Sequence, residues 1–422
     1  MNMHNSIKSV VSALVALFAL SMTCSAQVLP GIEVLEKRGF DGLRGKNVAL
    51  LTNPSGVDRN LRSTIDILAG AEEVNLKALF APEHGVRGDV YAGGSVTDTK
   101  DPKTGVPVYS LYGSNKAPTA KMLEGIDVLV YDIQDVGSRS YTFISTLGLV
   151  MRSCAENGVK VMVLDRPNPL GGNKVEGPLV QPGFHSFVSQ YRIPYIYGLT
   201  VGELAILLNE EGLNCGVDGT LKPLKCDLSV IPMEGWNRNM LYSDTGLPWV
   251  LPSPNIPYPA SAVNYPSSGI CGEFSGYLNI GIGYTLPFEV FAAEWIDADR
   301  LKEKLDSYEI PGTAFRTIHF KPFSGANQGK LVHGVQFHYT DFEAATCTLT
   351  QFYVMQAIHE LYPDHDPFGV APARDSMFDK VCGTDYVRKT FKVRMRVEDI
   401  LDWWSGDVED FKKLSCKYKL YQ

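Results

Sequence analysis

The chain has 422 residues, of which 45% are hydrophobic and 20% are charged, and its formal net charge is -8 at pH 7. This composition is typical of a globular protein with one large or two medium domains. The acidic balance argues against a nucleic-acid partner, because binding to phosphates requires a basic surface.

The N-terminus has the pattern of a secretory signal peptide. Lys8 precedes the apolar stretch VVSALVALFAL, which is too short to span a bilayer, and SMTCSAQ supplies a small-residue exit. We predict cleavage after Ala26, so that residues 1–26 are removed and the mature protein is exported to the periplasm. A lipoprotein anchored at Cys24 is the alternative, although Ser-Met-Thr before this cysteine is a poor lipidation motif. No later segment is long and apolar enough to cross a membrane.

Four short apolar runs in the first half of the chain predict a parallel β-sheet. They are NVALLTN (47–53), VNLKALFAPEHG (74–85), IDVLVYDIQD (126–135) and VKVMVLDRPNP (159–169). Each is apolar on both faces, as expected for strands that are covered on both sides. Helical patterns such as NLRSTIDILAG and SYTFISTLGLVMRSCAENG lie between them. This alternation predicts an α/β fold with a Rossmann-like, doubly wound parallel sheet.

The composition changes near residue 246, where GLPWVLPSPNIPYPASAVNYP is dense in proline and aromatic residues. Such a segment is typical of a domain junction. We therefore predict a Rossmann-like catalytic domain over residues 27–250 and a smaller α+β domain over residues 251–422 that closes a cleft. Just before the junction, Thr200 and Glu203 form a T-x-x-E capping box, which indicates a structural role for this carboxylate.

Polar or turn-forming residues end each of the four predicted strands. They are Asn53, Glu83, His84, Asp132, Asp135, Asp165, Arg166 and Asn168. In open α/β sheets the ligand crevice lies outside the carboxyl ends of the strands. The four segments therefore predict one shared site.

Glu83, in the stretch FAPEHGVRG, is a candidate general acid. A partly desolvated carboxyl group in a crevice can hold a raised pKa and donate a proton to a leaving group. The neighbouring His84 could orient Glu83 or bind substrate. A solvated acid in a turn, with a packed structural histidine, is the alternative for this pair.

The stretch YDIQDVGSRSYTF places Asp132, Asp135, Arg139 and Tyr141 within ten residues. Asp132 is the better functional candidate, because it lies nearest to the strand end. In the alternative, Asp135 and Arg139 form an internal ion pair that caps the following helix. Arg139 or Arg166 would suit an anionic substrate, because a planar guanidinium grips a carboxylate well. An arginine paired with a neighbouring aspartate is the competing interpretation.

Several other chemistries lack their motifs in this sequence. There is no G-x-S-x-G elbow of a serine hydrolase and no G-x-G-x-x-G dinucleotide site, so we predict no cofactor. His84, Asp132 and Asp165 could build a metal hydrolase, but no H-x-H or H-E-x-x-H spacing supports one. No two cysteines form a C-x-x-C pair, which argues against structural zinc. Most cysteines are expected to be buried as small apolar residues, although Cys215 and Cys226 could close a loop.

From about residue 31 onward, the chain resembles the bacterial exo-β-N-acetylmuramidases, a glycoside hydrolase family formerly known as a domain of unknown function. The matching stretches include LLTNPSGVD, LFAPEHGVRGD, YDIQDVGSRSYTF, VLDRPNPLGG, YGLTVGELA and LPWVLPSPNIP. The resemblance implies an exported enzyme of cell-wall turnover. Such an enzyme releases N-acetylmuramic acid from the non-reducing ends of peptidoglycan fragments, in a cleft between a Rossmann-like and a smaller domain.

The resemblance also implies roles for the candidate residues. Glu83 becomes the leading general acid, and Asp132 or Glu273 the second carboxylate. Arg139 and Arg166 would bind the lactyl carboxylate of N-acetylmuramic acid. The predicted substrate-binding set is completed by Asn53, His84, Tyr141, Asp165 and Asn168.

One segment departs from the family pattern. Ile282, within Gly281-Ile282-Gly283-Tyr284, stands where the family has an arginine, although Glu273 persists. This change could alter the substrate or weaken activity. A non-catalytic sugar-binding protein and a metal-dependent cell-wall hydrolase are therefore kept as the rival functions.

Overall fold

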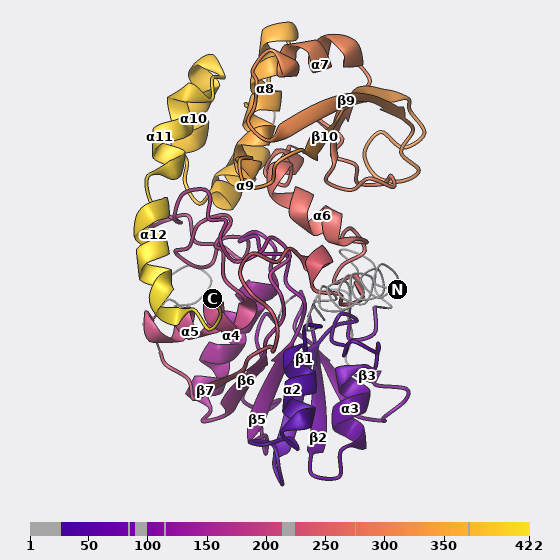
Figure 1. Cartoon of the computed structure of the whole chain (residues 1–422), viewed down its shortest axis with the longest axis vertical. Helices are drawn as coiled ribbons and strands as arrows, with labels where there is room; N and C mark the ends of the chain where they lie inside the picture. The colour runs from indigo at the N-terminus through magenta and orange to yellow at the C-terminus, as the bar shows by residue number, and fades with distance from the viewer. Residues whose placement is uncertain are drawn as a thin grey trace, which may run out of the picture.

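The computed structural model of the chain describes residues 27–82, 85–88, 99–113, 115–212, 224–274, 276–369 and 372–422. The predicted signal peptide with Cys24, the pair Glu83 and His84, and Cys215 lie outside these described residues. Within them, a sheet domain and a smaller domain are stacked along the long axis of the molecule (Figure 1).

The first domain is built around a seven-stranded sheet with the order β3-β4-β2-β1-β5-β6-β7. Its strands are β1 (Asn47–Thr52), β2 (Asn75–Ala81), β3 (Thr99–Lys100), β4 (Pro107–Ser110), β5 (Val128–Asp132), β6 (Lys160–Leu164) and β7 (Leu228–Ile231). All neighbours are parallel except β3 and β4. The order of the parallel strands reverses between β1 and β5, which is the switch point of a doubly wound sheet. The predicted fold class is confirmed.

Helices cover both faces of this sheet. They are α2 (Gly31–Lys37), α3 (Thr64–Gly70), α4 (Phe143–Glu156) and α5 (Val201–Glu210). On β1, Val48 and Leu50 belong to the layer packed under α2 and α3. Ala49 and Leu51 belong to the opposite layer, under α4 and α5. Because side chains alternate along a strand, a strand buried on both faces must be apolar throughout, as these runs are.

The predicted capping box at the start of α5 is confirmed. The Thr200 hydroxyl accepts a hydrogen bond from the Glu203 backbone N–H, and the Glu203 carboxylate accepts one from the Thr200 backbone N–H. Glu203 also forms a buried ion pair with Arg238 at 2.7 Å. This carboxylate is therefore structural, as the motif predicts.

The smaller domain contains a three-stranded antiparallel sheet with the order β8-β10-β9. Its elements are β8 (Val290–Ala293), β9 (Thr313–Phe320), β10 (Val332–Tyr339), α6 (Pro259–Asn264), α7 (Ala298–Asp306), α8 (Thr350–Leu361), α9 (Pro372–Cys382), α10 (Tyr386–Arg394), α11 (Glu398–Ser405) and α12 (Val408–Ser415). One face of the sheet packs on α7 and α8 through Leu301, Val335 and Phe352. This mixture of strands and helices confirms a second, smaller domain.

The last helix and the chain end return to the first domain. Phe411 of α12 packs in a cluster with Ile144 of α4 and Leu204 of α5. Figure 1 shows α12 running back along the molecule, with the C-terminus near α5. The predicted domain that spans residues 251–422 therefore contains a terminal segment that packs outside it.

The described cysteines are all free thiols. Cys154, Cys226, Cys271, Cys347 and Cys382 are buried, and Cys416 is exposed. The expectation that most cysteines pack as small apolar residues is confirmed for these positions. The pairing of Cys226 with Cys215 stays a prediction, since Cys215 is not described.

Candidate active site

The switch point of the sheet brings together the ends of β1 and β5. Thr52 and Asp132 are register partners there, and the Thr52 hydroxyl donates to the Asp132 backbone carbonyl at 2.7 Å. Both residues are buried. Polar groups at this edge therefore have a rigid frame, as a ligand site on an open α/β sheet requires.

Asp132 and Arg166 form a buried, bidentate ion pair across this edge. The Arg166 Nε lies 2.5 Å from Asp132 Oδ1 and its Nη2 lies 2.9 Å from Oδ2. The Thr64 hydroxyl donates to Oδ2 as well, at 2.5 Å. Burial opposes the charge of Arg166, but the Asp132 carboxylate prevails and raises the pKa of the guanidinium. Both oxygens of Asp132 are thus engaged, and the geometry favours the interpretation in which this arginine pairs with an aspartate.

Asp165 is fully buried at the end of β6 and faces the N-terminus of α5. Its carboxylate accepts from the backbone N–H groups of Arg166 and Gly202 and from the Thr200 hydroxyl, at 2.7 to 3.0 Å. Burial raises the pKa of Asp165 to about 6, and these donors oppose the rise. A carboxylate at a helix N-terminus is stabilised by the helix dipole. The position of Asp165 is that of a structural anion.

The side chains of Asn53 and Asn168 are hydrogen-bonded to neighbouring loops. The Asn53 amide donates to the carbonyl of Pro252 in the junction segment, and its oxygen accepts from Ser55. The Asn168 amide donates to Leu199, and both asparagines are buried. Their predicted contact with substrate stays a prediction.

Arg139 is buried and donates to four backbone carbonyls. Those of Pro178 and Ile193 belong to the first domain, and those of Val381 and Cys382 end α9 in the second. Burial lowers the pKa of Arg139 to about 10. A cation at the end of a helix satisfies its unpaired carbonyls and complements its dipole. The geometry thus gives Arg139 an interdomain structural position, and its guanidinium does not face a cleft.

The alternative ion pair between Asp135 and Arg139 is not formed. Asp135 instead accepts from the Gly137 backbone N–H at 2.8 Å and from the Tyr197 hydroxyl. Burial raises the pKa of Asp135 to about 6. Two residues that are four apart in sequence therefore serve separate parts of the fold.

Aromatic residues connect this edge to the second domain. The rings of Tyr141 and Tyr265 lie 5.3 Å apart, edge to face, and Tyr265 lies 4.9 Å from Phe288. The Ser140 hydroxyl bridges the hydroxyls of Tyr195 and Tyr265, at 2.8 and 2.9 Å. Tyr141, a predicted substrate-binding residue, is half-buried in this wall between the domains.

Glu273 lies on the second-domain side, in a short helical turn (Cys271–Glu273). Burial raises the pKa of its partly buried carboxyl group, and the nearby Arg374 opposes the rise. Arg374 donates to the Glu273 backbone carbonyl at 3.1 Å. Within the described part of the chain, no donor hydrogen-bonds the carboxylate itself. A carboxyl group in this state is available for proton transfer.

The described neighbours of Glu83 and His84 show where this turn is attached. Gly85 and Gly88 have φ values of 79° and 81°, a region that favours glycine. A Cβ atom on Gly88 would lie 2.7 Å from the Pro54 side chain. Gly88 therefore lies close to Pro54, in the loop after β1.

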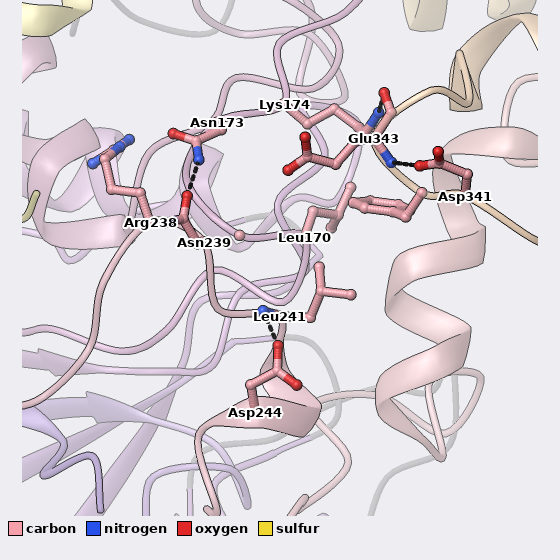
Figure 2. Close-up of a pocket in the computed structure, with 11 residues that line it drawn as sticks. Leu170, Asn173, Lys174, Arg238, Asn239, Leu241, Asp244, Asp341 and Glu343 are labelled. Atoms are coloured by element: carbon pink, nitrogen blue, oxygen red, sulfur yellow. Dashed lines mark hydrogen bonds between the residues drawn. The ribbon is translucent and has the colours of Figure 1, made fainter. Parts of the chain in front are cut away.

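A cavity of about 480 Å³ lies at the seam between the domains (Figure 2). It is lined by Leu170, Gly171, Asn173, Lys174, Arg238, Asn239, Leu241, Asp244, Asp341, Phe342 and Glu343. Its two cations are engaged, because Lys174 donates to the Ala345 carbonyl and Arg238 pairs with Glu203. None of the predicted site residues lines this cavity.

Ile282 occupies a tight turn in the second domain. Gly281 and Gly283 on either side have φ values of 92° and 82°. A Cβ atom on Gly281 would lie 1.9 Å from the Leu286 carbonyl oxygen, so this turn requires glycine. Ile282 is half-buried against the core of the domain. The place of the expected arginine is thus filled by a packed apolar side chain.

Sequence reasoning missed three groups beside these residues. The Thr64 hydroxyl donates to Asp132, and Arg374 donates to the backbone carbonyl of Glu273. The Tyr421 hydroxyl donates to Asp165 at 2.6 Å, although the two residues are 256 positions apart in the sequence. Thr64 begins α3 directly after the N-cap Ser63, which has a local sequence signal, whereas the other two contacts have none. Among the described residues, no group of three or more His, Cys, Asp or Glu could hold a metal ion.

Comparison with known proteins identifies the family. The family model for the N-terminal domain of exo-β-N-acetylmuramidase NamZ matches residues 48–260. The family model for the C-terminal domain of the same enzyme matches residues 263–421. The chain is 42% identical over 395 residues to the peptidoglycan β-N-acetylmuramidase NamZ of Bacillus subtilis (strain 168), covering 94% of this chain and 92% of that protein.

Solved structures agree with this match. Two crystal structures of DUF1343 family proteins from Bacteroides fragilis NCTC 9343 each cover 94% of this chain and 99% of their own. One is 51% identical with a TM-score of 0.88, and the other is 31% identical with a TM-score of 0.74. The chain therefore belongs to the exo-β-N-acetylmuramidase NamZ family, as its motifs predict.

Proposed function

We propose that this protein is an exo-acting glycoside hydrolase that releases N-acetylmuramic acid, or a related muramyl sugar, from the non-reducing ends of peptidoglycan fragments. The observation that carries the proposal is the similarity over 395 residues to a peptidoglycan β-N-acetylmuramidase. The switch-point edge of the sheet and the facing second domain offer a site for such a reaction. A second carboxylate close to the first would give retention of configuration, and a wider gap would give inversion.

Glu83 is the proposed general acid, and Glu273 the second carboxylate. Glu273 is preferred to Asp132 because both oxygens of Asp132 are already held by Arg166 and Thr64. No described residue donates to the Glu273 carboxylate, so among these residues its oxygens are open to substrate or water, in a partly desolvated setting. Asp132 then serves the site by fixing Arg166 rather than by reacting.

Arg374 is the proposed partner of the lactyl carboxylate. The sequence predicts this task for Arg139 and Arg166, but both side chains are buried and donate their hydrogen bonds to other groups of the protein. Arg374 is exposed and lies against Glu273, with one bond to a backbone carbonyl. A guanidinium with free donors can still form a bidentate pair with a carboxylate. It would replace the cation that Ile282 does not supply.

The test is hydrolysis of a chromogenic β-N-acetylmuraminide and of a disaccharide with terminal N-acetylmuramic acid. Release is expected to survive a chelator and to vanish in Glu83→Gln. Glu294→Gln serves as the matched control, because Glu294 is an exposed carboxylate paired with Lys330 at 2.8 Å. Measurable sugar binding without release would favour the non-catalytic binding protein, and chelator-sensitive release would favour the metal-dependent hydrolase.

The proposed location is the periplasm, after removal of residues 1–26. In the described part of the chain, no helix is long and apolar enough to span a membrane. Cell fractionation and mass spectrometry of the mature N-terminus test this location. A soluble protein that begins at Gln27 is expected, whereas a lipid-modified fragment that is lost in Cys24→Ala would establish the anchored alternative.

A further inference from the structure

The C-terminal tail, residues 418–422, packs against the first domain, with Tyr421 half-buried. The Leu420 backbone N–H donates to Glu203 at 2.8 Å, and the Gln422 carbonyl accepts from the Arg238 backbone N–H at 3.0 Å. The ring of Tyr421 packs edge to face on Trp236, with centroids 5.0 Å apart. The end of the chain is thus held in a defined position by contacts on both sides of Tyr421.

The Tyr421 hydroxyl reaches the loop that follows β6. It donates to Asp165 Oδ2 at 2.6 Å and accepts from the Met233 backbone N–H at 2.9 Å. The Thr200 hydroxyl shares Oδ2 at 2.7 Å. Because Asp165 is fully buried, loss of this hydroxyl would leave the carboxylate one hydrogen bond short.

The other carboxylate oxygen of Asp165 holds the backbone of Arg166 in place. Oδ1 accepts from the Arg166 backbone N–H at 3.0 Å and from the Gly202 backbone N–H at 2.8 Å. The side chain of Arg166 then holds both oxygens of Asp132 at the switch point. A continuous chain of hydrogen bonds therefore runs from the C-terminal tail to the end of β5.

We infer that Tyr421 is a positioning residue of the active site, which fixes Arg166 and Asp132 through the Asp165 carboxylate. The inference rests on the proposed function, because it takes the switch-point edge as the place of reaction. In this role Tyr421 acts through other residues, because it sets the geometry of the buried ion pair at the switch-point edge. The C-terminal family domain would therefore contribute its last residues to the site at the sheet edge of the N-terminal domain.

The test compares Tyr421→Phe with the matched control Tyr418→Phe. Both variants remove one phenolic hydroxyl from the same tail and keep the ring, but Tyr418 donates to Glu211 at the surface. We expect kcat of Tyr421→Phe to fall about tenfold, the effect of one lost hydrogen bond to a buried charge, with kcat of Tyr418→Phe unchanged.

The pH profile separates positioning from loss of stability. Charged or titratable groups facing Asp165 are Tyr421, Arg166 and Glu203. Burial raises the pKa of Asp165, and Tyr421 is the hydrogen-bond partner that lowers it most. Without the phenol this pKa rises further, so activity that needs ionised Asp165 is lost at a higher pH. The acid limb of kcat is therefore expected to move to higher pH in Tyr421→Phe only.

A double-mutant cycle with Asp165→Asn makes the test independent of folding yield. If Tyr421 acts through Asp165, the second substitution adds nothing to the first, and the two effects on kcat are not additive. Full kcat with an unmoved acid limb in folded Tyr421→Phe would overturn the inference, as would equal losses in both tyrosine variants. Additive effects in the cycle would also overturn it. If the wild-type protein releases no sugar, the proposed function fails, and the same variants are then compared by their Kd for N-acetylmuramic acid, where the same non-additivity is expected.

Discussion

At the edge of the first-domain sheet, Arg166 and Thr64 bind the Asp132 carboxylate, whereas no described residue donates a hydrogen bond to the Glu273 carboxylate, which lies near Arg374 in the second domain. Asp132 is fully buried, and Glu273 is partly accessible. A buried carboxylate with both oxygens engaged is rigid and costly to disturb, while a half-desolvated one can take up and release protons. The comparison separates the carboxylate that holds the site together from the one that can react in it.

Among substitutions at the described residues, the largest effect is expected from Glu273→Gln, which keeps the shape of the side chain and removes its charge. We expect kcat to fall by about a hundredfold to ten-thousandfold, the usual contribution of a group that transfers a proton. The melting temperature should stay close to that of the wild type, since no donor binds this carboxylate in the described chain. Release of sugar from a muraminide substrate and a thermal melt measure the two quantities.

Glu289→Gln is the matched control for this variant. Burial raises the pKa of Glu289 too, but its carboxylate is hydrogen-bonded by Gln336 at 3.0 Å. Its kcat should remain near that of the wild type. Equal losses in both variants would remove the distinction between an engaged and an available carboxylate.

Asp132→Asn should lower the stability of the fold, which Glu273→Gln should leave almost unchanged. Removal of one partner leaves the Arg166 charge buried and unpaired, which costs about 3 to 5 kcal/mol of unfolding free energy. Urea denaturation measures this loss. A stable Asp132→Asn protein without activity would instead show that the Asp132 charge serves the reaction rather than the fold. Replacing Asp132 and Arg166 together should restore part of the stability, because no unpaired charge then remains.

The fold could be predicted from the sequence because β1, β2, β5 and β6 are buried on both faces and therefore read as apolar runs. The strands β4 and β7 were missed, since each has only four residues, and PVYS begins with a proline. The shared edge followed from the polar residues at the strand ends. The hydrogen-bond partners of those residues could not be predicted. Arg139, for example, binds backbone carbonyls of segments up to 243 residues away, and a backbone carbonyl has no signal in the sequence.

The buried carboxyl group of Asp135 should make the free energy of unfolding depend on pH. Burial raises its pKa from the usual 3.8 to about 6, so between these values the folded state binds more protons than the unfolded state. The stability contributed by this group is therefore greatest at low pH and falls by roughly 3 kcal/mol as the pH rises through this range. Urea denaturation from pH 4 to 7 should show this decline in the wild type, reduced by that amount in Asp135→Asn. Parallel curves for the two proteins would contradict the raised pKa.

The smallest effect is expected from Ser140→Ala, which removes the hydroxyl between Tyr195 and Tyr265. Two neutral hydrogen bonds are lost, but the two phenols are left close enough to re-pair, so the cost should be about 1 kcal/mol. The first-domain and second-domain sides of the aromatic wall are joined here, and Tyr265 also packs on Tyr141. If the bridge sets the spacing between the strand ends and Glu273, KM and kcat should change together while urea denaturation shows only this modest loss. A change in stability with unaltered kinetics would mean that the spacing is set elsewhere, and Arg139, which holds the end of α9, is then the group that must supply it.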